Sequence, residues 1–214
     1  VKGGAATTLF GADAANGVIQ IFTKKGTAGQ NRVNFETQLG AITGTRDYLK
    51  YEETGDILFR RGFTQSYSVG IDGGREDVTY SVSGNVSSDN GFRLANNQKR
   101  YNFRAGFSAK VNDWLKYSSS GSFVSTEFSR DYNANNSFSS FGNLEGGAYG
   151  DLSELDEQGF NDLKEEVRNY VALTDITETV KRFQNSLGFE FNVNDKVSGR
   201  MNLGIDSRVS KQQD

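Results

Sequence analysis

From residue 31 onward, apolar and polar residues alternate with a period of two. The clearest segment runs from Tyr101 to Val111, where every second residue is apolar or alanine and the residues between them are polar or glycine. Successive side chains of a β-strand point to opposite faces, whereas a helix repeats every 3.6 residues. Weaker versions of the pattern cover about 33–41, 66–72, 78–86, 115–123, 183–193 and 197–205. The alternation predicts an all-β fold of about seven antiparallel strands.

Charged residues are confined to one of the two faces that this alternation defines. The apolar faces carry no Lys, Arg, Asp or Glu through their middles, and the opposite faces hold Glu36, Arg104, Glu190, Arg200 and Asp206. A Lys or Arg on the lipid face of a membrane barrel costs about 2–4 kcal/mol near the midplane, whereas the lumen accepts charge. The segment from Tyr101 to Val111 also reaches the roughly 9–11 residues of a tilted membrane strand, beyond the 5–6 usual in soluble sheets. Both features favour a transmembrane β-barrel over a soluble sandwich.

The connections between the predicted strands alternate in length. Short turns rich in Gly, Asn and Asp are expected at 73–77, 112–113 and 194–195, because these residues tolerate the backbone of tight hairpins. Long connections are expected at 44–63, 88–99 and 128–178. Outer-membrane barrels have short periplasmic turns and long extracellular loops, so the pattern predicts which end faces the outside of the cell.

The composition excludes several kinds of chemistry. Cys and His are both absent, which removes disulfides, Cys/His metal sites and Ser-His or Cys-His catalytic arrangements. The net charge of −3 provides no basic field for nucleic acid. The acidic stretch 72–77 lacks the spacing of a calcium loop and is interpreted as a hairpin turn. We therefore expect no enzyme activity, no catalytic residues, no cofactor, no metal site and no nucleic-acid partner.

Residues 1–28 differ in character from the rest of the chain. A stretch rich in small residues leads into the short apolar run 18–22. The string Gly-Ala-Asp-Ala-Ala-Asn-Gly-Val-Ile at 11–19, followed by Thr-Lys-Lys-Gly at 23–26, resembles the end of the plug domain in TonB-dependent transporters, and the SusC/RagA branch in particular. The segments 100–104 and 114–116 are similar to early barrel strands of that branch. The resemblance implies two parts: residues 1–28 as the C-terminal end of a plug domain, and residues 29–214 as the N-terminal portion of the barrel.

The same resemblance implies a function. Transporters of this branch import a bulky nutrient, commonly a glycan or a peptide, across the bacterial outer membrane with energy delivered through TonB. A surface lipoprotein of the SusD type commonly closes the barrel. Their barrels have about 22 strands, so the chain is expected to be an internal fragment. A siderophore or metal-complex receptor is an alternative, as is a structural or adhesive outer-membrane barrel without a plug, which would have no use for residues 1–28.

The connection 128–178 contains the candidate ligand or partner residues. A loosely helical pattern covers 154–171, with Gly159 as the expected break, and the surrounding segment is strongly acidic. Such a helix either covers the barrel rim with a solvated face or forms a lid that meets a partner or substrate. The residues that mix aromatic rings with an amide, as sugar sites do, are Tyr132, Asn135, Phe138, Phe141 and Tyr149. Ordinary loop packing would explain the same residues.

Overall fold

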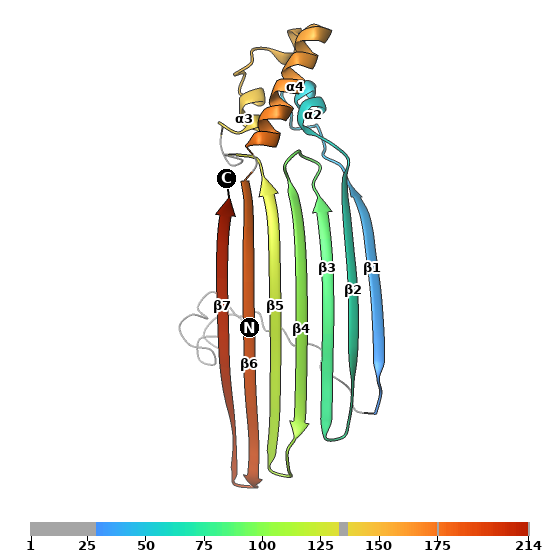
Figure 1. Ribbon diagram of the computed structural model, residues 1–214, viewed down its shortest axis with the longest axis vertical. Helices are drawn as coiled ribbons and strands as arrows, with labels where there is room; N and C mark the ends of the chain where they lie inside the picture. Colours follow the sequence, from blue (N-terminus) through green and yellow to red (C-terminus); the bar gives the residue numbers. More distant parts are fainter. Residues whose placement is uncertain (1–28, 133–136, 175, 214) are drawn as a thin grey trace.

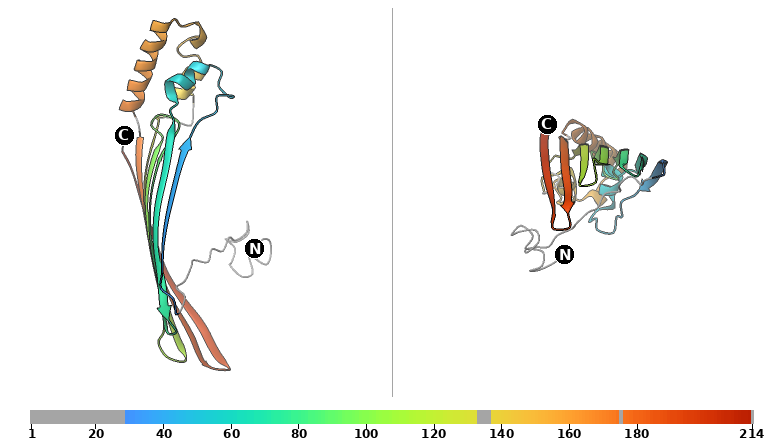
Figure 2. Two further views of the ribbon diagram at one scale, coloured as in Figure 1. Left: turned by 90° about the vertical axis from the view of Figure 1, so that its right-hand side faces the viewer. Right: turned by 90° about the horizontal axis from the view of Figure 1, so that it is seen from below.

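The seven strands predicted from the alternation form one antiparallel sheet. The computed structural model describes residues 29–132, 137–174 and 176–213, so the predicted plug segment lies outside the described residues. The strands pair in the order β1-β2-β3-β4-β5-β6-β7, which leaves β1 and β7 at the open edges (Figure 1). Their bounds are β1 Arg32–Ile42, β2 Gly62–Arg75, β3 Val78–Asn90, β4 Asn97–Lys110, β5 Leu115–Arg130, β6 Ile176–Asn194 and β7 Val197–Gln213. The predicted fold class is confirmed, and the sheet is curved rather than flat (Figure 2).

Short turns join the strands at one end, which we call the turn end. In the β4–β5 turn, the Asn112 side chain accepts hydrogen bonds from the backbone N–H groups of Trp114 and Leu115, at 3.1 and 2.8 Å. In the β6–β7 turn, the Asn194 side chain accepts one from the Lys196 N–H at 2.9 Å. Asn side chains in this position close a turn by replacing a backbone partner. The short turns predicted at 112–113 and 194–195 are confirmed.

The β2–β3 turn is tighter than the predicted 73–77. Only residues 76–77 lie between the strands, because Gly73 pairs with Tyr80 and Gly74 with Thr79. A Cβ atom at Gly74 would lie 2.2 Å from the Val78 carbonyl oxygen, which no side chain tolerates. The glycines therefore serve close strand pairing beside the turn rather than the turn itself.

The other three connections leave the opposite end of the sheet, the helical end. The connection 91–96 has six residues, so the long loop predicted at 88–99 is wrong. The polar residues on either side of it continue the ladder, up to the pair Asn90–Asn97. Backbone hydrogen bonds hold this extension, and they leave no apolar signature in the sequence.

Helices occupy the two longer connections at this end (Figure 1). Between β1 and β2 lies α2 (Glu52–Leu58), which the alternation did not predict. Between β5 and β6 lie α3 (Ser140–Glu145), the 3-10 helix η2 (Leu152–Glu154) and α4 (Glu157–Leu173). None of the helices in the described residues is both long and apolar enough to span a membrane.

The predicted helix near 154–171 exists as α4, but Gly159 does not break it. Asp156 is the N-cap residue, and its Oδ1 accepts a hydrogen bond from the Gly159 N–H at 2.8 Å. Gly159 therefore lies in the first turn, where it donates to the capping side chain. Its position explains why a residue with poor helix propensity is tolerated here.

Replacing the capping residue is expected to destabilise α4 locally. Asp156→Ala removes the acceptor for the Gly159 N–H and should cost about 1 kcal/mol. Hydrogen exchange of the α4 amides in the full-length protein measures this cost. Asp162→Ala, at an exposed position inside the same helix, is the matched control. Equal acceleration of exchange in the two variants would contradict the capping role.

Candidate functional site

One face of the sheet exposes large apolar side chains along its whole width. Phe35 on β1 is 73% exposed, and each of the other strands has one or more large apolar residues that are about two-fifths to two-thirds exposed, whereas Tyr80, Tyr117 and Phe189 are half-buried. The register aligns them in rows across the strands: Tyr67–Val86–Tyr101, Val69–Gly84–Phe103–Phe123, Ile71–Val82–Ala105, Tyr80–Phe107 and Val78–Ala109–Tyr117. A contiguous exposed apolar surface marks contact with a membrane or another protein. We call this side the apolar face.

Tyrosines border the apolar face at both ends. Tyr67 and Tyr101 lie in the row nearest the helical end, and Tyr80 and Tyr117 lie towards the turn end. The ten residue steps from Tyr101 to Val111, at about 3.4 Å each and tilted by about 40°, give a height of roughly 25 Å. An apolar band of about this height, bordered by aromatic residues at both ends, is typical of the lipid-facing surface of outer-membrane barrels.

Charged residues that point to the apolar side lie at or beyond these tyrosines. They are Arg75, Lys99, Glu127, Lys181 and Lys211. Lys181 stands in the row of Tyr101 and Ser125, where a long side chain can reach the interface. The middle of the band is free of charge, as predicted.

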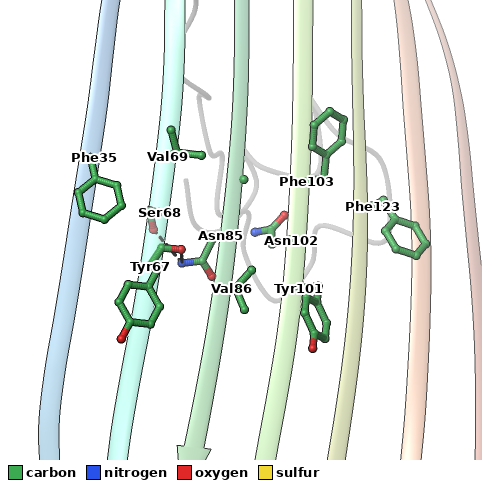
Figure 3. Close-up of a pocket in the computed structure, with 11 residues that line it drawn as sticks. Phe35, Tyr67, Ser68, Val69, Asn85, Val86, Tyr101, Asn102, Phe103 and Phe123 are labelled. Atoms are coloured by element: carbon green, nitrogen blue, oxygen red, sulfur yellow. Dashed lines mark hydrogen bonds between the residues drawn. The ribbon is translucent and has the colours of Figure 1, made fainter.

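The apolar face contains a hollow of about 320 Å³ around Gly84 (Figure 3). Gly84 has no side chain, and its neighbours Val69, Val86 and Phe103 leave the space open. A Cβ atom at Gly84 would find its nearest neighbour, the Val69 Cγ1 atom, at 4.0 Å. Most of the side chains that line this hollow are aromatic or aliphatic, and Ser68, Asn85 and Asn102 complete the lining.

The opposite side of the sheet, the polar face, is held together by hydrogen bonds and ion pairs between strands. Asn85 donates to the hydroxyl oxygens of Ser66 and Ser68, at 2.8 Å each, and Figure 3 shows the second of these bonds. Arg182 forms a two-point ion pair with Asp206, and Arg200 pairs with Glu190 at 3.2 Å. These residues face away from the apolar band, as the alternation predicts.

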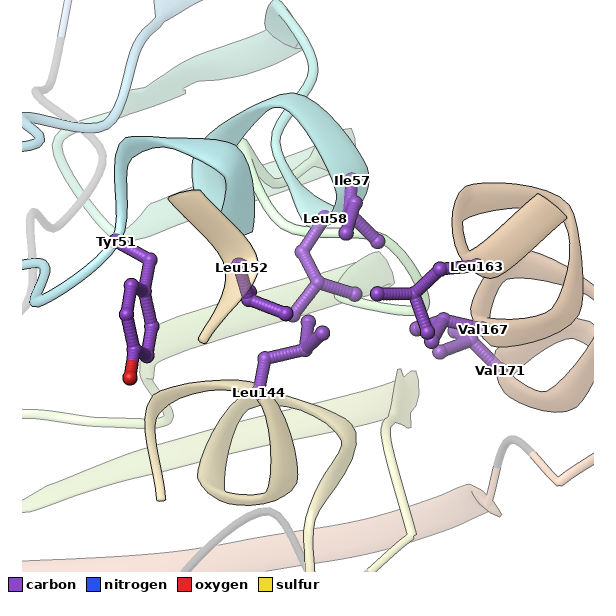
Figure 4. Close-up of a cluster of buried hydrophobic side chains, with 8 residues drawn as sticks. All are labelled: Tyr51, Ile57, Leu58, Leu144, Leu152, Leu163, Val167 and Val171. Carbon is purple, nitrogen blue, oxygen red and sulfur yellow. The ribbon is translucent and has the colours of Figure 1, made fainter. Parts of the chain in front are cut away.

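The helical connections pack together into one unit, which we call the cap: α2, α3, η2 and α4 with the segments that join them. Its centre is a cluster of buried side chains (Figure 4): Tyr51, Ile57, Leu58, Leu144, Leu152, Leu163, Val167 and Val171. Within the described residues, the buried hydrophobic side chains are these eight and Ile176 at the start of β6. The protein therefore has its buried core outside the sheet, above its helical end.

Polar contacts join the two halves of the cap. Arg168 on α4 donates to the Ile57 carbonyl oxygen at 2.9 Å, and the Lys50 backbone N–H donates to Glu145 at 2.5 Å. The connection 91–96 joins them through the Leu94 N–H, which donates to the Leu58 carbonyl oxygen at 2.9 Å. Three connections far apart in the sequence thus form a single body over the barrel end.

Two of the five predicted ligand residues pack within the cap. The ring of Phe141 lies 6.1 Å from that of Tyr48, and the Arg93 guanidinium lies 4.8 Å from its centroid. Tyr149 is half-buried against the hydrophobic cluster. Burial raises the pKa of the Tyr149 phenol, and the negative charge of Glu166 adds to the effect.

Tyr132 and Phe138 are less enclosed. Phe138 is 71% exposed, and Tyr132 is also exposed. Asn135 lies outside the described residues. The ligand role of Tyr132, Asn135, Phe138, Phe141 and Tyr149 stays a prediction.

The contribution of α2 was not predicted from the sequence. Ile57 and Leu58 supply the side of the cap core that faces α4 (Figure 4), but a seven-residue helix is too short for a clear 3.6-residue pattern. The available signal was the pair of acidic residues Glu52 and Glu53 in its first turn, ahead of the apolar pair.

Two curated proteins are similar to the chain in sequence. The TonB-dependent receptor P3 of Formosa agariphila is 25% identical over 123 residues, which cover 47% of this chain and 12% of that protein. The TonB-dependent receptor SusC of Bacteroides thetaiotaomicron is 28% identical over 158 residues, which cover 58% of this chain and 15% of SusC. No family model matches the chain.

Solved structures share the fold. The RagAB peptide importer in its open-open state matches with a TM-score of 0.73 and 17% identity, over 99% of this chain and 31% of that one. Its closed-closed state matches with a TM-score of 0.70 and 17% identity, over 95% of this chain and again 31% of the other. The predicted resemblance to the SusC/RagA type of TonB-dependent transporter is confirmed, and the chain spans about a third or less of these proteins.

Proposed function

We propose that the chain is part of a TonB-dependent transporter that imports a bulky nutrient, a glycan or a peptide, across the bacterial outer membrane. The observation that carries the proposal is the charge-free apolar band between two rows of tyrosine, backed by a polar face with ion pairs. A soluble sheet does not leave its large apolar residues exposed in this way. The similarity to two receptors named as TonB-dependent supports the same class.

The relatives also bear on the kind of cargo. RagAB is named as a peptide importer, and the sheet and cap of this chain share its fold. A glycan remains the other cargo of this transporter branch. A siderophore or metal complex is disfavoured, because the plug-like string at 11–26 resembles the SusC/RagA branch.

We further propose that the cap meets the partners outside the membrane. A lipoprotein of the SusD type would contact its outward surface, where Phe138 and Leu173 are exposed. TonB would act through the plug domain and a segment N-terminal to it. Membrane lipid would surround the apolar face.

The transport proposal is tested by uptake in whole cells that carry the full-length protein. Fluorescent peptide and glycan mixtures are supplied separately, and accumulation is compared in cells with and without TonB. We expect one of the two mixtures to accumulate, and the accumulation to disappear without TonB. Uptake that persists without TonB, or no uptake of either mixture, would overturn the proposal.

Membrane topology provides a separate prediction. Single cysteines at Asn161 in α4 and Asp195 in the β6–β7 turn, introduced into the full-length protein, report the two ends of the sheet. We expect an impermeant maleimide to label position 161 on intact cells, and position 195 only after the outer membrane is opened. The reverse pattern would show that the sheet is inverted.

A further inference from the structure

A second hollow, of about 310 Å³, lies at the helical end of the sheet, where polar-face residues of three strands contribute to its lining. It is bounded by the ends of β3, β4 and β5 and by the connection 91–96. Its lining includes Asp89, Asn96, Asn97, Gln98, Phe128 and Arg130. The volume falls at the lower end of the range for small-molecule sites, about 300–1,000 Å³.

An aromatic ring in this position is unusual for this sheet. Phe128 points to the polar side, in one row with Asp89, Gln98 and Glu178. It is the single aromatic residue at any polar-face position of β1–β7, all of which belong to the described part of the chain. Contact between an aromatic ring and water is unfavourable, and a ligand that covers the ring removes this cost.

Charged and amide groups surround this ring without pairing to one another. Neither Gln98 nor Arg130 makes a side-chain hydrogen bond or an ion pair with any described residue, although both are half-buried. Asp89 accepts a hydrogen bond from Thr64, which orients the carboxylate. Half-buried donors and acceptors without a partner are costly unless a ligand or water satisfies them.

The wall of the hollow is fixed by Arg60, which follows α2 in the chain. Arg60 donates to the Gly91 carbonyl oxygen at 3.0 Å and to the Asn97 side-chain oxygen at 2.6 Å. Its backbone N–H donates to the Phe92 carbonyl oxygen at 2.7 Å. The connection 91–96 is therefore held in place before any ligand arrives, which lowers the entropic cost of binding.

Asp89 and Arg130 do not form an ion pair with each other or with another described residue. They stand two strands apart, and Arg130 lies two residues beyond the row of Asp89, so their Cα positions are about 10–12 Å apart. Three or four residues of extended peptide cover the same distance at about 3.3 Å each. Glu178 pairs with Phe128 on the neighbouring strand, and its carboxylate accepts a hydrogen bond from the Ser210 hydroxyl.

We propose that this hollow is a cargo site for a short extended peptide. Arg130 receives the peptide carboxylate, Asp89 receives its ammonium group or a basic side chain, Gln98 bonds the peptide backbone, and Phe128 packs against an apolar side chain. An uncharged glycan would use the ring and the amides but would leave the separated charges unsatisfied. The inference rests on the proposed transport function and specifies its substrate class.

The test uses the purified full-length transporter and a defined mixture of synthetic peptides of four to eight residues. Bound peptides are identified by mass spectrometry, and the affinity of one of them is measured by titration calorimetry. Arg130→Gln should weaken binding of a peptide with a free carboxylate roughly tenfold, the loss of one charge-assisted hydrogen bond. The C-terminally amidated peptide has no free carboxylate, so Arg130→Gln and the wild type should bind it with equal affinity. Phe128→Ala should weaken both peptides.

Val124→Ala, on the same face of β5 but outside the hollow, is the matched control and should bind like the wild type. Gln98→Ala is a second site variant, and heat-modifiable electrophoretic mobility checks that every barrel is folded. Unchanged peptide affinity in folded Arg130→Gln and Phe128→Ala would overturn the inference. The inference would also be overturned if a neutral gluco-oligosaccharide competed with the peptide in the wild type and in Arg130→Gln but not in Phe128→Ala. If the wild type shows TonB-dependent uptake despite either result, the proposed transport function stands and only the assignment of this site is wrong.

Discussion

Val82→Lys in the full-length protein is expected to cost about 2–4 kcal/mol in the free energy of unfolding from a bilayer. Val82 belongs to the middle row of the apolar face, between Ile71 and Ala105, two rows from Tyr101. A lysine there has to hold its ammonium group in hydrocarbon or span about 10 Å, the height of four tilted residues, to reach the row of Tyr101. Urea titration of the barrel in lipid vesicles measures the loss.

The neighbouring position gives the control. Ser81→Lys places the same side chain one residue away on the polar face, opposite Asp72 and Gly106. The polar face already carries the Arg32–Asp72 ion pair in this row and Gly106 has no side chain, so a loss below about 1 kcal/mol is expected. Similar losses at positions 81 and 82 would contradict the assignment of the two faces.

Leu163→Ala is expected to destabilise the cap by about 2–5 kcal/mol, the usual range for truncating a leucine in a packed core. Leu163 is 8% exposed and lies in the hydrophobic cluster with Val167 and Ile57. The truncation leaves a cavity where α4 meets α2. Hydrogen exchange should therefore accelerate in both helices, although they belong to different connections.

Leu173 provides a control within the same helix. It is 85% exposed, so Leu173→Ala should change the stability of the cap by less than about 0.5 kcal/mol. Exchange in the strands β2–β5 should stay unchanged in both variants, because the cap core does not extend into the sheet. Faster exchange confined to α4 in Leu163→Ala would show that the two connections fold independently.

The joint cap also changes how loop deletions should be interpreted. Removing residues 131–175 would take away Leu144, Leu163 and Val167 and expose Ile57 and Leu58 on the remaining connection. A loss of transport after such a deletion would therefore not identify a cargo contact. Single substitutions at Phe128 or Arg130 avoid this difficulty, since neither belongs to the cap core.

The sequence by itself determined the number of strands, the two faces of the sheet and the position of two of the three tight turns. Each of these depends on local chemistry. A period of two fixes which side chains share a face, and Asn112 and Asn194 close their turns with their own side chains. The uncharged middle of the apolar face is equally a property of single positions, because the alternation alone decides which residues belong to that face.

Only the tertiary structure decided the ends of the strands, the cap and the polar hollow. The polar residues of 87–90 and 97–100 extend β3 and β4 because their backbones pair, and that pairing depends on register rather than on side-chain pattern. The cap core joins Ile57 to Val167 across more than a hundred residues, and no local period encodes such a contact. Phe128 gains its neighbours Asp89 and Gln98 in the same way, from two other strands. Long-range packing brings these side chains together, so their contacts can be seen only in the folded chain.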